Sequence, residues 1–241
     1  MGWWFGITIM AGSTGPDIVT DGLVLSLDAA NKKSYPGSGT VITDLSGNAI
    51  NGTLTNGPTF DSGNVGTINF DGTNDYVDMD RDTNYDFVRT DSFTLSGWFN
   101  ITQADANAAI VGKWGTNSNS TGGYMIWAGG SGGTNLLFSV ANGGSTAAST
   151  TAITHTFGTW NYITGIYYSN TKLEIYKNGT LSQTANYTGD INNPAVNFTI
   201  GKADYGSQTF TGKSAIVTVH NKALTSTEIV QNYNATKSRF I

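Results

Sequence analysis

Short strand-like runs separated by turn residues restrict the fold of this chain more than any other feature. Leu23, Leu25 and Leu27 lie at alternate positions of the first run, and a period of two indicates a strand with one buried face. Comparable runs follow at Thr67–Phe70, Asp75–Met79, Phe93–Ile101, Ala108–Trp114, Tyr124–Ala128, Leu136–Ala141, Trp160–Tyr168, Lys172–Lys177, Val196–Gly201 and Ser214–His220. Because Gly- and Asn-rich turns separate them, they predict an all-β sandwich of two antiparallel sheets.

Two local signals and one strand pattern add detail. The dipeptide Asn178-Gly179 predicts a tight hairpin, because a type I′ turn needs two residues with positive φ. Thr225 and Glu228 have the spacing of a capping box before helically spaced apolar residues, which predicts one short C-terminal helix. Within Phe93–Ile101, apolar and polar residues take opposite faces, which predicts a half-buried antiparallel strand.

Composition excludes several classes of protein. The chain has 241 residues, a length at which a β-sandwich forms one domain. It has 0 cysteines, which rules out disulfides and thiolate metal sites. A net charge of −5 argues against a nucleic-acid partner, which needs clustered Lys and Arg. No apolar run approaches the roughly 18 residues of a membrane span, so no membrane partner is expected.

The first 20 residues differ from the rest of the chain. They begin with an apolar stretch that lacks the preceding basic residues of a secretory signal, and its large side chains are Trp3, Trp4, Phe5, Ile7 and Ile9. These side chains either pack on the chain's own domain or form an arm that docks onto a partner; a natural start at Met10 is a third interpretation. We therefore divide the chain into an N-terminal aromatic arm, residues 1–20, and one domain, residues 21–241.

Catalytic carboxylates are scarce. A glycosidase needs two carboxylates flanking the scissile bond, but the chain has only two glutamates. Glu174 lies on a strand beside a tight hairpin and Glu228 belongs to the capping box. One further acidic set could substitute for them: Asp75, Asp78 and Asp80. A solvated loop edge is the simpler interpretation of this set. We expect no enzyme and no catalytic residue.

Aromatic residues near loops are candidates for sugar binding, because an exposed ring stacks on the apolar face of a pyranose. Trp114 ends one run and opens a polar loop, and Trp127 and Tyr205 also lie near loops. Ordinary packing is the alternative for each of them. Trp98 and Trp160 lie inside strands instead, so we expect them in the core.

The order of the segments carries a further indication. The segments are Asp21–Asn31, Asp44–Asn48, Asn51–Leu54, Phe70–Val77, Phe93–Phe99, Trp160 with Tyr167, Leu173 and Tyr176, Phe198–Gly201, Phe210–Gly212, and Ala223–Glu228 followed by Tyr233. Spanning about residues 21–239, they resemble laminin-G-like domains of the concanavalin A superfamily. The resemblance implies a concanavalin A-like jelly-roll sandwich. The superfamily includes lectins, adhesion modules and structural domains, so the fold alone does not set the function.

The resemblance also bears on metal binding, because members of this superfamily often hold one calcium ion at a sandwich edge. It would place the ion in the turn Asp71–Asp75, with the carboxylates of Asp71 and Asp75 among its hard oxygen ligands. The alternative is that Asp71 only caps its own turn. No other cofactor is expected.

The opening segments Asn31–Gly39 and Leu54–Phe60 are similar to chains among the virion proteins of tailed phages. This similarity implies a non-enzymatic structural protein on a virion surface, as a head decoration or part of the tail. Its partners would be other virion proteins, bound through the arm, and surface glycans. The alternative is a carbohydrate-binding, lectin-like module of a bacterial surface or secreted protein, in an extracellular or cell-surface location. A homo-oligomer is left open.

Overall fold

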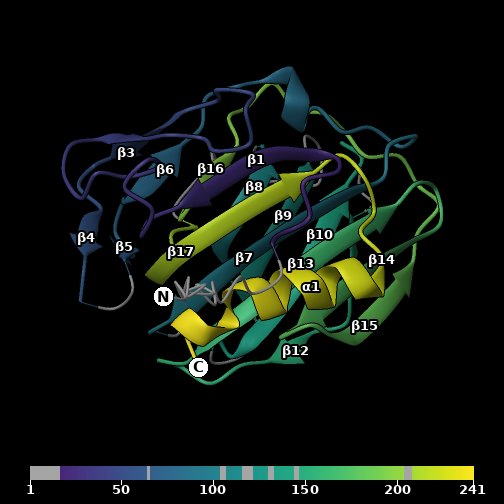
Figure 1. Ribbon diagram of the computed structural model, residues 1–241. Helices are drawn as coiled ribbons and strands as arrows, with labels where there is room; N and C mark the ends of the chain where they lie inside the picture. Colours follow the sequence, from purple (N-terminus) through teal and green to yellow (C-terminus); the bar gives the residue numbers. More distant parts are fainter. Residues whose placement is uncertain are drawn as a thin grey trace, which may run out of the picture.

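Two antiparallel sheets packed face to face make up the domain (Figure 1). The structure, a computed structural model, describes residues 17–63, 66–103, 107–115, 122–129, 133–143, 147–203 and 208–241. The element order and the sheets agree with a jelly-roll sandwich, so the predicted fold class is confirmed. Among the described residues, no helix is long and apolar enough to span a bilayer.

The first sheet, sheet A, contains eight strands of the described chain in the order β15-β14-β13-β7-β17-β5-β4, with β1 also beside β17. Its strands are β1 (Leu23–Asp28), β4 (Thr59–Asp61), β5 (Thr67–Asp71), β7 (Phe93–Ile101), β13 (Trp160–Tyr168), β14 (Lys172–Lys177), β15 (Thr180–Asn186) and β17 (Thr211–His220). The long strand β17 pairs with β5 through its first half and with β1 through its second half.

Sheet B contains nine described strands in the order β11-β10-β9-β8-β16-β6-β3-β2, with β12 also beside β10. Its strands are β2 (Val41–Ile42), β3 (Gly52–Thr55), β6 (Tyr76–Asp78), β8 (Ala108–Trp114), β9 (Gly123–Gly129), β10 (Asn135–Ala141), β11 (Ala147–Ser149), β12 (Ile153–Thr154) and β16 (Thr199–Ile200). The helical elements are α1 (Ser226–Thr236) and the 3-10 turns η1 (Thr83–Tyr85) and η3 (Lys237–Arg239).

Turn and cap chemistry explains two of these elements directly. Asn178 and Gly179 have φ values of 53° and 80°, as the predicted hairpin between β14 and β15 requires. The Thr225 hydroxyl accepts from the Glu228 backbone N–H, and the Glu228 carboxylate accepts from the Thr225 backbone N–H at 2.7 Å. The predicted capping box and helix are therefore confirmed.

The main core lies between the two sheets. Phe93 of β7 forms an aromatic cluster with Phe87, which stacks on it at 4.4 Å, with Tyr124 at 4.6 Å and with Phe138 at 6.1 Å. All four side chains are buried. Burying a side chain of this size contributes roughly 1.5–3 kcal/mol relative to leaving it in water, so this cluster holds the sheets together.

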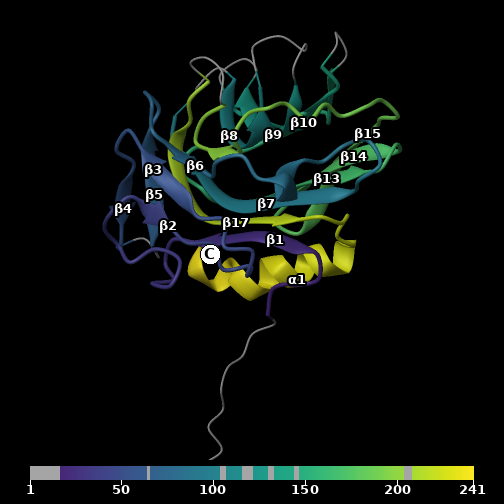
Figure 2. The ribbon, with the colours of Figure 1, turned by 90° about the horizontal axis from the view of Figure 1, so that it is seen from above.

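The outer face of sheet A is covered by α1 (Figure 2). Strand β7 is consequently buried at every position, which corrects the prediction that its polar side faces solvent. Trp98 is buried as expected, but between sheet A and the C-terminal segment rather than between the sheets. Its indole N–H donates to Thr236 Oγ1 at 2.8 Å, and Phe240 stacks on its ring at 4.2 Å. Trp160 is only partly buried against the same ring of Phe240.

A row of hydroxyl groups lies under α1. Thr164, Ser96 and Thr218 are register partners on β13, β7 and β17, so their side chains lie side by side on the helix-facing side of the sheet. All three are buried, and none of their hydroxyls makes a hydrogen bond of ordinary geometry with a described residue, although the Tyr162 hydroxyl lies close to all three. The contact between helix and sheet is therefore partly polar, unlike the core between the sheets.

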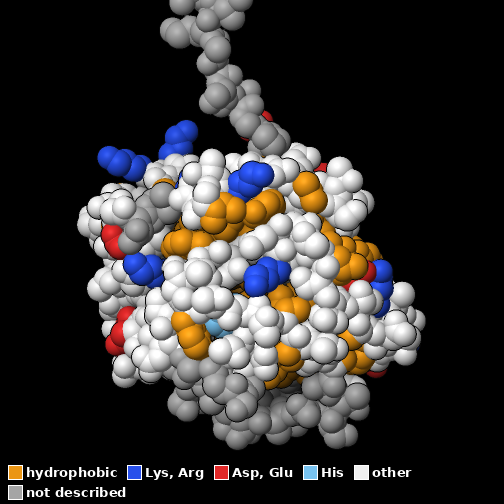
Figure 3. All heavy atoms as spheres, turned by 90° about the horizontal axis from the view of Figure 1, so that it is seen from below, with side chains coloured by type: hydrophobic (Ala, Val, Ile, Leu, Met, Phe, Trp, Pro, Cys, Tyr) orange, Lys and Arg blue, Asp and Glu red, His pale blue; other side chains and the backbone are white. Residues whose placement is uncertain are grey.

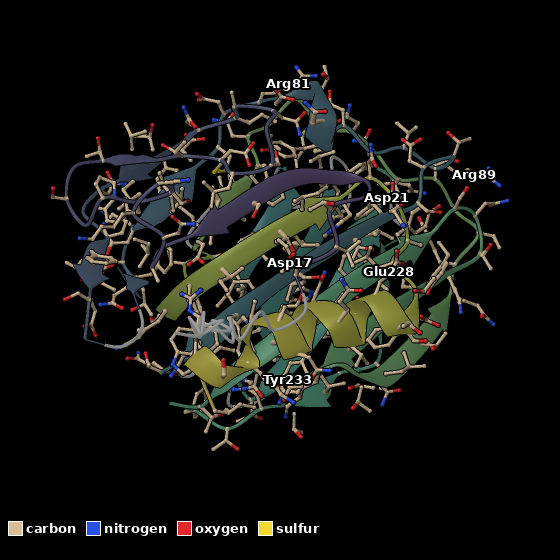
Figure 4. The ribbon with its side chains drawn as sticks, in the orientation of Figure 1. Asp17, Asp21, Arg81, Arg89, Glu228 and Tyr233 are labelled. Atoms are coloured by element: carbon tan, nitrogen blue, oxygen red, sulfur yellow. The ribbon has the colours of Figure 1, made fainter. Side chains whose placement is uncertain are left out.

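The segment before β1 is fastened to the helix side of the domain. The Val19 N–H donates to Asn232 Oδ1 at 2.7 Å, and the Val19 carbonyl lies 3.0 Å from Nε2 of His220. Lys222 binds the carboxylates of Asp21 and Glu228 at 2.6 and 2.8 Å, and both acids lie beside the start of α1 (Figure 4). Residues 17–20 thus pack with the domain.

The expected docking residues lie outside the part of the chain that the structure describes: Trp3, Trp4, Phe5, Ile7 and Ile9.

Candidate functional site

The outer face of sheet B is the sheet face that no described helix covers, since α1 lies against sheet A (Figure 2). Strand alternation places Trp114 on this face at the end of β8, and Met125 and Trp127 on it along β9. These side chains form one apolar cluster with Ala109 and Ala203. The structure therefore brings two of the predicted sugar-binding residues to one surface. The third, Tyr205, lies outside the described residues.

Trp127 lies flat on this surface. Its indole N–H donates to the Ser139 hydroxyl of the neighbouring strand at 2.6 Å, and that hydroxyl lies 2.6 Å from Ser149 Oγ. At the other end of the ring, a Cβ on Gly129 would collide with two ring carbons. The ring thus extends along the strand from Ser139 to Gly129, and the indole is fixed in orientation before any ligand arrives.

An amide side chain lies beside the Trp127 ring. Asn107 is exposed, and its Oδ1 atom would be 3.2 Å from a Cβ on Gly129. Its backbone is left-handed, with φ of 62°, a conformation that Asn tolerates better than most residues. A partly exposed indole beside an exposed amide is the arrangement that binds a sugar ring, through its apolar face and its hydroxyl groups.

Trp114 is partly buried and packs on the same cluster. It does not stack on Trp127; Met125 and Gly112, which pair across β8 and β9, lie between the rows of the two indoles. Trp114 therefore extends the apolar surface rather than forming a second platform beside Trp127.

The predicted calcium residues border a separate hollow of about 260 Å³ at the edge of the sandwich. Asp71 Oδ1 accepts from the Thr73 N–H at 2.7 Å, and Asp75 Oδ2 accepts from the Asp71 N–H at 3.2 Å. The bond from the Thr73 N–H lowers the pKa of Asp71, while burial, opposed by the bond from the Asp71 N–H, raises the pKa of Asp75. Asp71 thus caps its own turn, as the alternative requires, and calcium binding stays a prediction.

Glu174, one of the two glutamates, is engaged in structural contacts. Glu174 is buried, and its carboxylate accepts from Lys172 at 2.6 Å, Tyr168 at 2.9 Å and Tyr176 at 3.0 Å. Burial opposes its charge, but these donors outweigh burial and lower its pKa. Within the described ranges, no three Asp, Glu, His or Cys side chains gather around a metal position.

A buried ion pair joins β8 to the segment after η1. The Lys113 ammonium contacts the Asp86 carboxylate and lies 2.6 Å from Asn193 Oδ1. Burial lowers the pKa of Lys113, and the Lys113 donor holds the pKa of Asp86 low despite burial. Because Lys113 is 1% exposed, its ammonium serves as a structural contact between β8 and this segment.

Sequence reasoning found the tryptophans but not their neighbours. Asn107 belongs to a Gly/Asn-rich chain in which no single Asn stands out. Ser139 reaches the Trp127 indole only through the register that pairs β9 with β10, which the sequence does not reveal. Gly129 lies on β9 itself, two residues after Trp127, and this spacing on one strand was the available signal, because glycine in a strand often marks a position that a neighbouring group approaches closely.

A sandwich with a helix on one outer face and an aromatic cluster on the other defines a lectin-like β-domain. The chain belongs to the laminin-G type of the concanavalin A-like lectin/glucanases superfamily, whose pattern matches residues 71–230. None of the curated proteins compared with the chain matches it.

Solved structures share this fold at low identity. The binding domain of Paraclostridial Mosquitocidal Protein 1 is 17% identical with a TM-score of 0.70, covering 90% of this chain and 52% of that one. The Botulinum neurotoxin serotype D ligand-binding domain in complex with N-acetylneuraminic acid is 15% identical with a TM-score of 0.71, covering 90% and 52%. The serotype G binding domain is 14% identical with a TM-score of 0.69, covering 88% and 50%. The chain spans about half the length of these structures.

Proposed function

We propose that this chain is a non-enzymatic saccharide-binding domain whose ligand stacks on Trp127. The observation that carries the proposal is the fixed, partly exposed indole of Trp127 on the face of sheet B that no described helix covers, with the Asn107 amide beside it. Binding by the similar toxin domains supports the class of function without naming a ligand for this chain. Both glutamates are engaged in structural contacts, which supports binding rather than hydrolysis.

The test is a glycan array, followed by calorimetric titration of the strongest neutral oligosaccharide. Trp127→Ala should weaken binding at least about tenfold, because truncating a central aromatic contact typically costs about 2 kcal/mol. Trp127→Phe keeps a ring but loses the bond to Ser139, so it should weaken binding less. Gly129→Ala should also weaken it by displacing the indole, with residue 127 intact.

Thermal unfolding of each variant is the control for folding. Unchanged affinity in both folded Trp127→Ala and Gly129→Ala variants would end the proposal. An array without any glycan signal for the wild-type chain would favour a purely structural domain instead.

We further propose that the domain acts on the surface of a phage virion. The support is the sequence similarity of Asn31–Gly39 and Leu54–Phe60 to tailed-phage virion proteins, together with the aromatic N-terminal residues. Electron microscopy of particles from the source sample should show copies on a head or tail. Absence from purified particles would instead favour the alternative, a module of a bacterial surface or secreted protein.

The docking role of the aromatic arm has its own test. Because Val19 packs against Asn232 and His220, the deletion should remove residues 1–16 and stop there. The truncated chain should keep its melting temperature but lose incorporation into particles. Normal incorporation would end the docking hypothesis.

A further inference from the structure

A second hollow lies at the edge of sheet A, between the segment after β1, strand β4 and the C-terminal turn η3. Its volume is about 360 Å³, within the size range of small-molecule sites. Small and apolar residues line most of it, with two aromatic rings, Tyr35 and Phe60, and two cations, Lys32 and Arg239. None of the residues predicted from the sequence to bind a ligand lies in it.

The aromatic lining of this hollow is rigid. The rings of Tyr35 and Phe60 pack at 5.2 Å with an interplanar angle of 59°. Tyr35 is buried and donates its hydroxyl to the Gly39 carbonyl at 2.8 Å, whereas Phe60 is only partly buried. A Cβ on Gly37 would lie 3.3 Å from the Phe60 ring, and Gly37 has φ of 97°. Glycine thus lets the backbone pass close to the ring and keeps the hollow in shape.

The two cations of the hollow differ in whether they form an ion pair. Arg239 makes a two-fold contact with Asp28 at 2.8 and 3.0 Å, which fixes the guanidinium and balances its charge. Lys32 is exposed and forms no ion pair with any described residue. On a chain of net charge −5, the hollow therefore carries a local positive charge that would attract an anion.

We propose that this hollow binds a carboxylated sugar, with the pyranose over Phe60 and the carboxylate at Lys32. An apolar floor with one unpaired ammonium suits a ring that has one apolar face and a single delocalised charge. A phosphate site is typically built around a guanidinium fork, but the Arg239 fork of this hollow is already bound by Asp28. The site is separate from the Trp127 surface and does not depend on it. Figure 3 shows one face of the molecule, on which Lys and Arg side chains lie next to hydrophobic side chains.

The test is an NMR titration of the full chain with D-glucuronate, using D-glucose as the matched neutral probe. Glucuronate should bind more tightly than glucose, and raising the salt concentration to about 0.5 M should weaken the binding by screening. Lys32→Gln should weaken it about tenfold, as expected for a lost charge-assisted contact. Phe60→Leu, which keeps apolar volume but loses the flat ring, should also weaken it.

The neighbouring exposed Lys33 provides the matched control, because it does not line the hollow. Lys33→Gln removes the same charge and should weaken binding less than about threefold. In Trp127→Ala, the glucuronate-induced shifts of the residues that line the hollow should be unchanged, which separates this site from the proposed lectin surface. Equal effects of Lys32→Gln and Lys33→Gln, loss of those shifts in Trp127→Ala, or no preference for glucuronate over glucose at the hollow would each overturn the proposal.

Discussion

His220 shows how one buried side chain links the folded state to pH. It is 0% exposed, and Nε2 lies 3.0 Å from the Val19 carbonyl, while Nδ1 has no hydrogen-bond partner among the residues that the structure describes. Burial lowers its pKa below the ordinary 6.5, although the bond to Val19 opposes the shift. The folded domain therefore favours the neutral imidazole.

We predict that stability falls as the pH drops through 6.5. In that range the unfolded chain takes up a proton at His220 that the folded chain does not, which favours unfolding. The free energy of unfolding should decrease by up to about 1.4 kcal/mol from pH 7.5 to 5.5, measured by urea denaturation. His220→Gln, which can still donate to the Val19 carbonyl, should reduce this dependence; an identical pH slope in that variant would contradict the assignment.

Residue-scale prediction from the sequence was best where chemistry is local. The turn at Asn178-Gly179 and the cap at Thr225 depend on neighbours within three residues, and both formed as predicted. Trp98 was recognised as buried, but its partner Phe240 is 142 positions later in the chain. No local pattern could assign that side chain to the helix side rather than the core between the sheets.

Among the elements, α1 depends most on a single residue. The Thr225 hydroxyl accepts from the backbone N–H of Glu228 at 3.3 Å and satisfies one of the free donors of the first turn. Thr225→Ala should lower the free energy of unfolding by about 1 kcal/mol. The adjacent Ser226→Ala, exposed and without a cap role, should change it by less than about 0.5 kcal/mol. Equal losses in both variants, again by urea denaturation, would contradict the cap.

The contact between α1 and sheet A allows a prediction of the opposite sign, a substitution that does not destabilise the domain. The buried Thr164 hydroxyl makes no hydrogen bond of ordinary geometry with a described residue and only approaches the Tyr162 hydroxyl, so Thr164→Val should be neutral or stabilise the domain by about 1 kcal/mol. Thr94 on the neighbouring strand donates to the Lys222 carbonyl and accepts from the Leu224 N–H, at 2.8 and 3.0 Å. Thr94→Val should therefore destabilise it by about 1–3 kcal/mol.

Melting temperatures of the two valine variants, measured side by side, decide this point. If Thr164→Val destabilised the domain as much as Thr94→Val, the Thr164 hydroxyl would have a partner, such as an ordered water, that offsets its burial.

Strand prediction worked where the pattern was long. The bounds of four strands match the expected runs: β7, β8, β13 and β14. Each of these runs is long enough for its pattern of residues to be visible. The run Val196–Gly201 shortened to β16. The short strands β2 and β12 have 2 residues each, too few for any period to be visible, and only pairing with neighbours defines them.

At the scale of the whole molecule, calcium would act through its preference for the folded state. If Asp71 and Asp75 bind the ion, 5 mM calcium at about 100 times Kd would stabilise the domain by about 2.7 kcal/mol. The melting temperature should then rise with calcium, but not with magnesium, which demands a stricter geometry. Asp75→Asn should abolish the rise, and a wild-type melting temperature that ignores calcium would leave Asp71 as a turn cap only.

The position of Val19 determines which face of the domain would point away from a support to which the chain is attached. The chain enters the domain beside α1, on the side of sheet A, and sheet B forms the opposite layer (Figure 2). Trp127 lies on the outer face of sheet B. A tether attached ahead of residue 17 would therefore hold the domain with its tryptophan surface turned away from the support. Many copies mounted in this orientation would engage a glycan-coated surface together, and avidity would convert weak individual contacts into firm attachment.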